Sequence, residues 1–327
     1  MALTALKQVE PRPVYDGYFA DPFVWKHEGV YYAVGTGAQE ASGHTSGNIF
    51  PMLRSENFLD WQPAGDALIP PDPQLGNTFW APEVAYEDGY FYLYYSVGHG
   101  DSRHQLRVAS SATPEGPYLD LGKTLLNTTA VPFAIDPHPF RDADGRWYLF
   151  YACDFLDCSD CTRAGTALGV CRMTSMTELE QSVGVVLRAR SDWQRFQNPR
   201  SMYGRVWDWH TLEGPCVVRH EGRYYCFYSG GRWENETYGV DYGVSDNILG
   251  PYLDTGNESG PRVLRTEPGK WIGPGHNSWI VGPDGNDNLV FHAWNTEMTM
   301  RRMFIAGLCW TPNGPKVQEM ESVPHVP

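Results

Sequence analysis

The chain has 327 residues, a length that fits one large all-β domain or two ordinary domains, and its 42% hydrophobic content excludes a disordered chain. Its formal net charge of −14 argues against nucleic acid, anionic membranes and polyanionic polysaccharides as partners, and favours a neutral ligand. Aromatic residues make up 14% of the chain, which suits both sheet cores and the stacking of sugar rings.

The sequence contains no apolar run of about 18 residues, so no transmembrane helix is predicted. Residues 1–12 lack the apolar segment of a signal peptide, and we therefore expect a cytoplasmic location unless a leader has been removed. The seven cysteines are an odd number, so at least one is unpaired within the chain, which favours a reducing compartment. The sequence leaves the oligomeric state open.

Five segments follow one plan along the chain: a short strand with a polar marker residue, a turn with Gly beside an acidic residue, and an aromatic-rich strand. Turns of this composition are typical of tight β-hairpins. Repeats of this length with about four short strands predict an all-β chain, folded as a single five-bladed β-propeller domain over residues 1–327. A β-sandwich with a second domain is the alternative. The marker residues are Asp21, Glu83, Asp136, Glu213 and His276, with spacings of 62, 53, 77 and 63 residues.

Helical periodicity is almost absent from the chain. The one short helix that the sequence predicts lies at Met176–Ser182.

Three of the marker residues are candidates for acid–base chemistry. Asp21, Asp136 and Glu213 belong to the first strands of the first, third and fourth repeats, so we expect them to converge at one end of a central channel. Asp21 and Asp136 precede proline, which we expect to hold them extended. Glycoside hydrolysis needs one carboxyl to protonate the leaving oxygen and another to activate water, and a third raises the pKa of the donor by repulsion. The alternative is that these acids only cap turns, and Glu83 is a rival for one role.

These residues also carry a resemblance to glycoside hydrolase family 43, the arabinanase, arabinofuranosidase and β-xylosidase group, that extends from Asp16 to Lys316. The resemblance implies inversion at the anomeric carbon with no cofactor required for the chemistry. It assigns Asp21 as general base, Glu213 as general acid and Asp136 as the residue that tunes and orients the acid. An inverting pair predicts carboxyls roughly 6.5–9.5 Å apart. The motifs are Ala20-Asp21-Pro22, Trp80-Ala81-Pro82-Glu83, Ile135-Asp136-Pro137, Glu213-Gly214-Pro215 and Gly273-Pro274-Gly275-His276-Asn277-Ser278.

Within that family, the segment around His276 and the run Arg301–Trp310 resemble the arabinan-acting branch. This resemblance implies cleavage of α-L-arabinofuranosidic linkages in plant cell-wall polysaccharide or oligosaccharides. It also implies a structural Ca²⁺ near His276, although Ca²⁺ prefers oxygen ligands and the sequence names no carboxylate cage for it. The alternative is that His276 is a hydrogen-bonded core histidine.

The substrate-binding candidates are Phe23, Trp80, His138 and Arg302, each of which has a structural role as its alternative. The segments Gly43–Pro51 and Trp193–His210 read as long loops that could wall a pocket, and a walled pocket favours exo action on chain ends. A β-xylosidase on the same scaffold is the nearest rival function. A non-catalytic sugar-binding propeller and a protein-interaction propeller are the others.

Four cysteines, Cys153, Cys158, Cys161 and Cys171, fall within one repeat. Four thiolates could hold a structural Zn²⁺, but the spacing is not that of a paired Cys-x-x-Cys knuckle. Disulfides and free thiols remain the alternatives.

Overall fold

The computed structural model describes residues 12–38, 49–180, 184–256 and 258–318, and β-strands dominate them. Within these ranges the only helical segments are two single 3₁₀ turns, η1 (Pro73–Leu75) and η2 (Asp192–Gln194). The predicted all-β class is therefore confirmed. In the same ranges no helix is long and apolar enough to cross a membrane.

The first, second and last repeats each form a four-stranded antiparallel sheet, ordered as in the sequence. Their strands are β1 (Ala20–His27), β2 (Val30–Thr36), β3 (Ile49–Ser55) and β4 (Gln62–Leu68); β5 (Thr78–Glu87), β6 (Tyr90–His99), β7 (Ser102–Ser111) and β8 (Leu119–Thr124); and β18 (Ile272–Val281), β19 (Asp287–Trp294), β20 (Arg301–Thr311) and β21 (Gly314–Gln318).

The third and fourth repeats share one nine-stranded sheet. Their strands are joined because β15, with 16 residues, extends beyond its own repeat, where it pairs with β14 and runs parallel to the start of β11. The described residues thus form four sheets, where the sequence predicts five separate ones. The strands are β9 (Ala134–Arg141), β10 (Trp147–Phe155), β11 (Gly165–Ser175), β12 (Glu178–Leu179), β13 (Gly184–Leu187), β14 (Arg195–Met202), β15 (Arg205–His220), β16 (Arg223–Gly230) and β17 (Gly239–Ser245).

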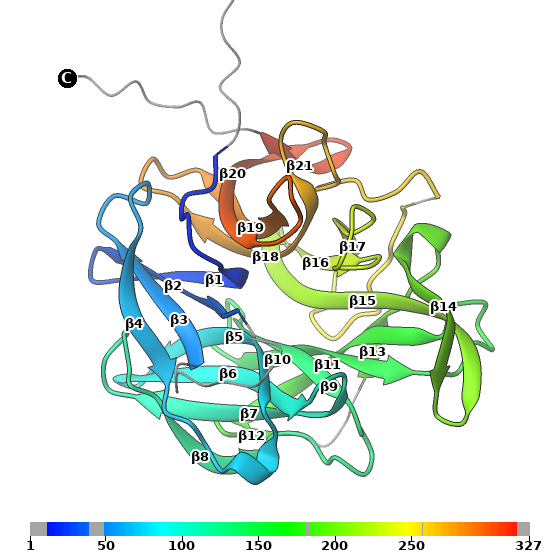
Figure 1. Ribbon diagram of the computed structural model, residues 1–327, viewed down its shortest axis with the longest axis horizontal. Coiled ribbons are helices and arrows are strands. Elements are labelled where there is room, and N and C mark those ends of the chain that lie inside the picture. Colours follow the sequence, from blue (N-terminus) through cyan, green and yellow to red (C-terminus); the bar gives the residue numbers. More distant parts are fainter. Residues whose placement is uncertain (1–11, 39–48, 181–183, 257, 319–327) are drawn as a thin grey trace, which may run out of the picture.

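The five repeats are arranged around a common centre (Figure 1). The first strands β1, β5, β9, β15 and β18 each contact the next one, and β18 contacts β1, which closes a ring. Five hydrophobic clusters fill the spaces between successive repeats. The cluster that joins the last repeat to the first includes Phe19 and Tyr31 from one side and Val290 and Met303 from the other.

The hairpin turns have the geometry that their sequences predict. In the turn between β1 and β2, Glu28 and Gly29 have φ values of 47° and 88°, and Asp88 and Gly89 after β5 have 51° and 83°. Two successive positive φ angles define the turn whose twist matches that of the strands it connects.

Each first strand is interrupted by a residue with positive φ, where its pairing with the second strand shifts register. These bulges contradict the expectation that proline holds Asp21 and Asp136 extended. The freed backbone N–H groups donate to the neighbouring repeat: Ala81 N–H to Thr36 Oγ1 and His276 N–H to Ser229 Oγ. The bulged residues are Asp21 (φ 48°), Ala81 (48°), Asp136 (57°), Gly214 (55°) and His276 (51°).

The helix predicted at Met176–Ser182 is wrong. Glu178 and Leu179 form β12, which folds back antiparallel onto the end of β11. The Met176 carbonyl, which a helix would use internally, instead accepts a hydrogen bond of 2.7 Å from Tyr94 Oη, and the Met176 side chain is buried against the neighbouring repeat. Tertiary packing therefore overrides local propensity here. Residues 181 and 182 lie outside the described residues.

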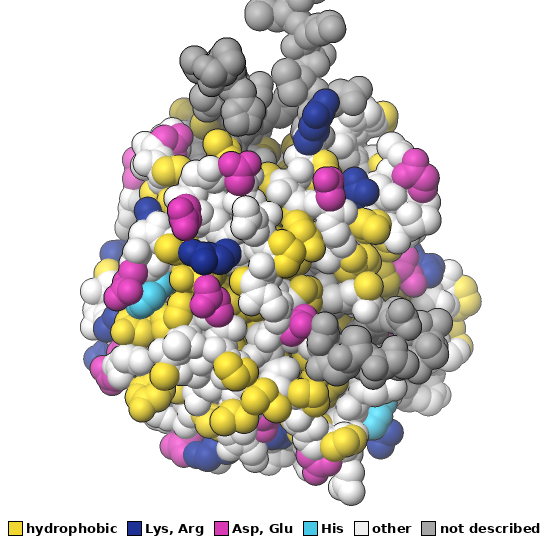
Figure 2. Space-filling view, turned by 60° about the vertical axis from the view of Figure 1, so that its left-hand side comes forward, with side chains coloured by type: hydrophobic (Ala, Val, Ile, Leu, Met, Phe, Trp, Pro, Cys, Tyr) yellow, Lys and Arg dark blue, Asp and Glu magenta, His cyan; other side chains and the backbone are white. Residues whose placement is uncertain are grey.

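On the face that Figure 2 shows, Asp and Glu side chains are dispersed among Lys, Arg and apolar side chains. The negative charge of the chain is therefore not gathered into one patch on that face.

Candidate active site

A cavity of about 470 Å³ lies where the five first strands meet; we call it the central cavity. This volume is within the range of small-molecule sites. Each first strand contributes a residue at or beside its bulge to the lining, because a bulge redirects side chains that a regular strand would alternate. These residues are Asp21 from β1, Trp80 from β5, Asp136 from β9, Glu213 from β15 and His276 from β18.

Asp21 is buried among basic and imidazole groups. Its Oδ1 lies 3.6 Å from Arg301 Nη1, 3.4 Å from His276 Nδ1 and 3.3 Å from His292 Nδ1. Burial alone would raise the pKa of Asp21, but these neighbours outweigh burial and hold it well below its usual range. Asp21 is therefore ionised at neutral pH.

Burial lowers the pKa of both histidines beside Asp21, that of His292 to about 4, and the negative charge of Asp21 opposes this effect. His292 Nδ1 also accepts a hydrogen bond of 3.0 Å from the Asp21 N–H. Arg301 is the permanent cation beside Asp21.

Glu213 has the opposite electrostatic environment. Burial raises its pKa to about 7, and the charge of Asp21 adds to this effect, while a hydrogen bond of 2.6 Å from Tyr238 Oη to Glu213 Oε1 opposes it. A carboxyl with this pKa carries a proton for a large part of the time at neutral pH, so it can donate one.

Tyr238 reaches Glu213 because the neighbouring strand carries a glycine. A Cβ atom on Gly275 would lie 2.0 Å from the Tyr238 ring, so any other residue would displace the ring. Gly275 thus leaves the space that Tyr238 needs in order to donate its hydrogen bond to Glu213.

Asp136 contacts the strand that carries Glu213 and lies near His276, the neighbour of Asp21. Its Oδ2 accepts a hydrogen bond of 2.8 Å from the N–H of Gly214, the residue after Glu213, and lies 4.0 Å from His276 Nδ1. Burial, together with repulsion from Glu213 and Asp21, raises the pKa of Asp136 well above its usual range. Asp136 therefore fixes the strand that carries Glu213 and shares its electrostatic environment.

Trp80 lines the central cavity, where the sequence predicts it. Its ring stacks on His104, with centroids 3.8 Å apart and planes 17° apart. Burial lowers the pKa of His104 to about 4, and its Nε2 lies 2.8 Å from the Gly100 carbonyl oxygen. A neutral, hydrogen-bonded imidazole thus supports the indole from behind.

Three predicted binding residues do not line this cavity. Phe23 stacks on Trp25 within the cluster between the first two repeats. His138 is buried between Glu83 Oε2, 2.7 Å from its Nδ1, and the Val217 N–H, which donates to its Nε2. Glu83, the rival acid, is thereby engaged away from the cavity. Arg302 lies in a different hollow of the surface, 3.9 Å from Asp16.

Arg301, the neighbour of Arg302, lines the cavity instead. Successive residues of a strand point to opposite faces, so only one arginine of the pair can reach Asp21. Arg301 donates from Nε and Nη2 to Tyr18 Oη and lies over the rings of Trp233 and Trp294 at 4.6 and 5.7 Å. The Arg-Arg pair was a signal in the sequence, but only the register of β20 decides between its members.

A second, smaller cavity also has Glu213 in its lining; we call it the side cavity. It shares Trp80, Asp101, Ile135, Glu213 and Trp233 with the central cavity. The segment Trp193–His210 is not the long loop that the sequence predicts, because it forms part of η2, β14 and the start of β15. It still walls a pocket, since it contributes four residues to the side cavity. Of the other predicted wall, residues 43–48 lie outside the described residues.

The proposed metal sites gain no support from the described residues, where no group of three or more His, Cys, Asp or Glu side chains could hold a metal ion. The carboxylates nearest His276 are Asp21 and Asp136, which is fewer oxygen ligands than Ca²⁺ takes. Cys153 and Cys171 are buried, Cys158 and Cys161 are exposed, and no disulfide joins the four among the described residues. The disulfide alternative therefore does not hold in this structure.

One carboxylate held ionised and one carboxyl with a pKa of about 7, on the walls of one aromatic-lined cavity, are the pair that acid–base hydrolysis of a glycosidic bond requires. The fold and the site are thus those expected of a glycoside hydrolase. Residues 11–315 match the profile of Glycosyl hydrolases family 43, and the chain belongs to that family.

Similar proteins agree with this assignment. The chain is 29% identical over 317 residues to the Beta-D-galactofuranosidase xynD of Aspergillus niger, covering 92% of this chain and 81% of the relative. It is 30% identical over 272 residues to the Extracellular exo-alpha-(1->5)-L-arabinofuranosidase ArbA of Cellvibrio japonicus, covering 76% and 72%. The crystal structure of a thermostable family-43 glycoside hydrolase superposes with a TM-score of 0.80 at 29% identity, covering 97% of this chain and 98% of that one.

Proposed function

We propose that this chain is an inverting, exo-acting α-L-arabinofuranosidase, with Asp21 as general base, Glu213 as general acid and Asp136 as the residue that positions the acid. The observation that carries the proposal is the opposite displacement of the Asp21 and Glu213 pKa values at one cavity. We infer that the fold is a single five-bladed β-propeller domain whose third and fourth blades are joined through β15.

The reaction is a single displacement at the anomeric carbon. Asp21 takes a proton from a water whose oxygen bonds to C1, while Glu213 gives its proton to the glycosidic oxygen as the C1–O bond breaks. Arg301 keeps Asp21 ionised before the reaction, and the hydrogen bond from Gly214 to Asp136 keeps Glu213 in position. The separation of the Asp21 and Glu213 carboxyls that inversion requires stays a prediction.

The Cellvibrio relative, an exo-acting arabinofuranosidase, favours an arabinofuranoside as the substrate. Such a sugar is uncharged, which suits a chain with a net charge of −14. A β-D-galactofuranoside is the second candidate, because the Aspergillus relative matches 92% of this chain. The two furanoses share the configuration of the ring carbons, and galactofuranose has one further hydroxymethyl group. A β-D-xyloside remains the third.

Exo action is supported by the Cellvibrio relative, whose name gives it as an exo-acting enzyme. Arg200 Nη2, on β14, lies 3.9 Å from Asp101 Oδ2, in the turn between β6 and β7, and both residues line the side cavity.

The test is hydrolysis of nitrophenyl α-L-arabinofuranoside, β-D-galactofuranoside and β-D-xyloside by the wild type, Glu213→Gln and Glu221→Gln. Glu221 is an exposed glutamate in the turn after the same strand, so it is the matched control. We expect the arabinoside to be the best substrate, with activity lowered about 10²–10⁴-fold by Glu213→Gln alone. We also expect NMR to show the inverted anomer first. Preference for another glycoside, or a retained product, would replace that part of the proposal.

A further inference from the structure

The side cavity shares Glu213, the proposed acid, with the central cavity but is not lined by Asp21, the proposed base. Asp21, Asp136 and Arg301 line only the central cavity, whereas Glu213 lines both. In an inverting displacement the base and its water attack one face of the sugar, and the acid protonates the oxygen that leaves on the other. If the proposed function holds, the sugar that is released from the acid therefore extends into the side cavity.

The hairpin formed by β14 and β15 places the cationic side chain of Arg200 in the lining of the side cavity. The Arg200 guanidinium lies 4.6 Å from the ring centroid of Phe196 and 5.3 Å from that of Trp209, all three on the hairpin. Its Nε lies 2.9 Å from Met202 Sδ, and its only other polar contact among the described residues is the one with Asp101 at 3.9 Å. The Nη donors are thus held in place by rings and have capacity for a further acceptor.

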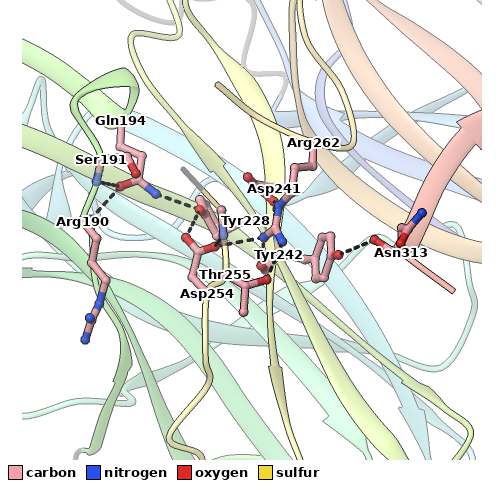
Figure 3. A network of polar contacts seen from close by, with 11 residues as sticks. Arg190, Ser191, Gln194, Tyr228, Asp241, Tyr242, Asp254, Thr255, Arg262 and Asn313 are labelled. Carbon is pink, nitrogen blue, oxygen red and sulfur yellow. Dashed lines mark hydrogen bonds and ion pairs between the residues drawn. The ribbon is translucent and has the colours of Figure 1, made fainter. Parts of the chain in front are cut away.

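The hairpin is held at both ends. At its turn, Tyr203 Oη donates a hydrogen bond of 2.6 Å to Asp154 Oδ2 on β10. At its base, Gln194 Nε2 donates to Tyr228 Oη, which donates to Asp254, and Arg262 joins Asp254 to the buried Asp241 (Figure 3). A site built on a fixed hairpin loses little free energy to ordering when a ligand binds.

We propose that the side cavity is a leaving-group subsite, in which Arg200 donates hydrogen bonds to the hydroxyl groups of the departing sugar. Asp101 lies on the opposite wall and can accept from the same sugar. The side cavity measures about 90 Å³ against about 470 Å³ for the central cavity, so it holds only the part of the leaving sugar that is nearest the scissile oxygen. Arg200 is therefore a specificity residue for saccharide leaving groups.

The test compares two substrates that share the glycone and differ in the leaving group: arabinobiose, whose leaving group is a sugar, and nitrophenyl α-L-arabinofuranoside, whose leaving group has no hydroxyl to accept from Arg200. The variants are Arg200→Ala and Arg205→Ala. Arg205 is exposed on the same hairpin and lies over Trp207, away from both cavities, so it is the matched control. Arg200→Lys retains the charge and much of the packing, and it carries the test if Arg200→Ala does not fold.

We expect Arg200→Ala to lower kcat/KM for arabinobiose about 10- to 100-fold, with less than about a 3-fold change for the aryl glycoside. Arg205→Ala should leave both values unchanged, and Arg200→Lys should fall between. An equal loss on both substrates, or no loss on either, would overturn the subsite. Inactivity of the wild type on both substrates would overturn the proposed function and the subsite with it.

Discussion

At the scale of single residues, two carboxyls of similar intrinsic acidity have different pKa values in this site because their neighbours differ. His276 and the Arg301 guanidinium keep Asp21 ionised despite its burial. For Glu213, burial and the charge of Asp21 raise the pKa more than the Tyr238 hydrogen bond and the charges of Arg301 and Arg200 lower it. Burial raises the pKa of both carboxyls. The two pKa values therefore differ because the imidazole and guanidinium groups lie closer to Asp21 than to Glu213 and act more strongly on it.

This difference predicts the pH profile. The general acid must be protonated, so kcat/KM on an oligosaccharide should fall as pH rises through the Glu213 pKa of about 7, while the limb that belongs to Asp21 should lie far below it. Tyr238→Phe removes a donor that stabilises ionised Glu213, so the pKa rises and the alkaline limb moves to higher pH by about 1 unit.

The control for this shift is Tyr86→Phe, which changes an exposed tyrosine far from the cavity. A limb that stays in place in Tyr238→Phe, or moves to lower pH, would mean that Glu213 is not the acid that the profile reports.

At the scale of elements, the first strand of each repeat has a bulge that turns side chains toward the central cavity. The bulge sets Asp21, Asp136 and His276 at positive φ, a conformation that costs of order 1–3 kcal/mol for residues other than glycine. Hydrogen bonds from the neighbouring repeat hold several of these bulges in place. The strain is thus concentrated where the side chains must turn toward the cavity.

The close packing beside one bulge can be tested with Gly275→Ala. Its new Cβ would meet the Tyr238 ring at 2.0 Å, so we expect a loss of about 1–3 kcal/mol in the free energy of unfolding and impaired activity through the displaced Tyr238. Urea denaturation measures the first effect. Gly184→Ala, where nothing lies within 4 Å of the added atom, should change stability by less than about 0.5 kcal/mol. Equal effects of the two changes would contradict the packing account.

At the scale of the whole molecule, the ring is closed by a hydrophobic cluster and by backbone hydrogen bonds rather than by a shared strand. The first and last repeats meet through the cluster around Phe19 and through hydrogen bonds of 2.9 Å from the Val14 and Phe19 N–H groups to the Met303 and Arg301 carbonyls. The backbone that precedes β1 is thereby attached to β20, the strand that carries Arg301. Ring closure and the environment of Asp21 therefore depend on each other.

Phe19→Ala should show this dependence. Phe19 is fully buried in the cluster between the first and last repeats, so its truncation should cost about 3–5 kcal/mol in unfolding free energy. Because every repeat shares a core with both neighbours, unfolding in urea should remain a single transition at a lower midpoint. Tyr90→Ala, at a tyrosine that is 52% exposed, is the control and should change the midpoint little. Two separate transitions would show that the repeats do not unfold together.

The sequence determined the features that depend on local chemistry and on repetition. The hairpin turns, the all-β class, the five repeats and the marker residues Asp21, Asp136 and Glu213 were all readable, because turn glycines and the first-strand motifs recur at matching places in each unit. Trp80 was readable for the same reason, since it belongs to the motif of the second repeat.

Only the tertiary structure decided the features that depend on which side chains meet across the ring. Arg301 rather than Arg302 faces Asp21 because of the register of β20, and His138 pairs with Glu83 because two first strands are neighbours. The joined third and fourth repeats follow from the length of β15, and the side cavity follows from the hairpin that β15 forms with β14. Apart from the β14–β15 hairpin, which lies where the sequence predicts a long loop, these contacts join residues far apart in sequence, so no local pattern encodes them.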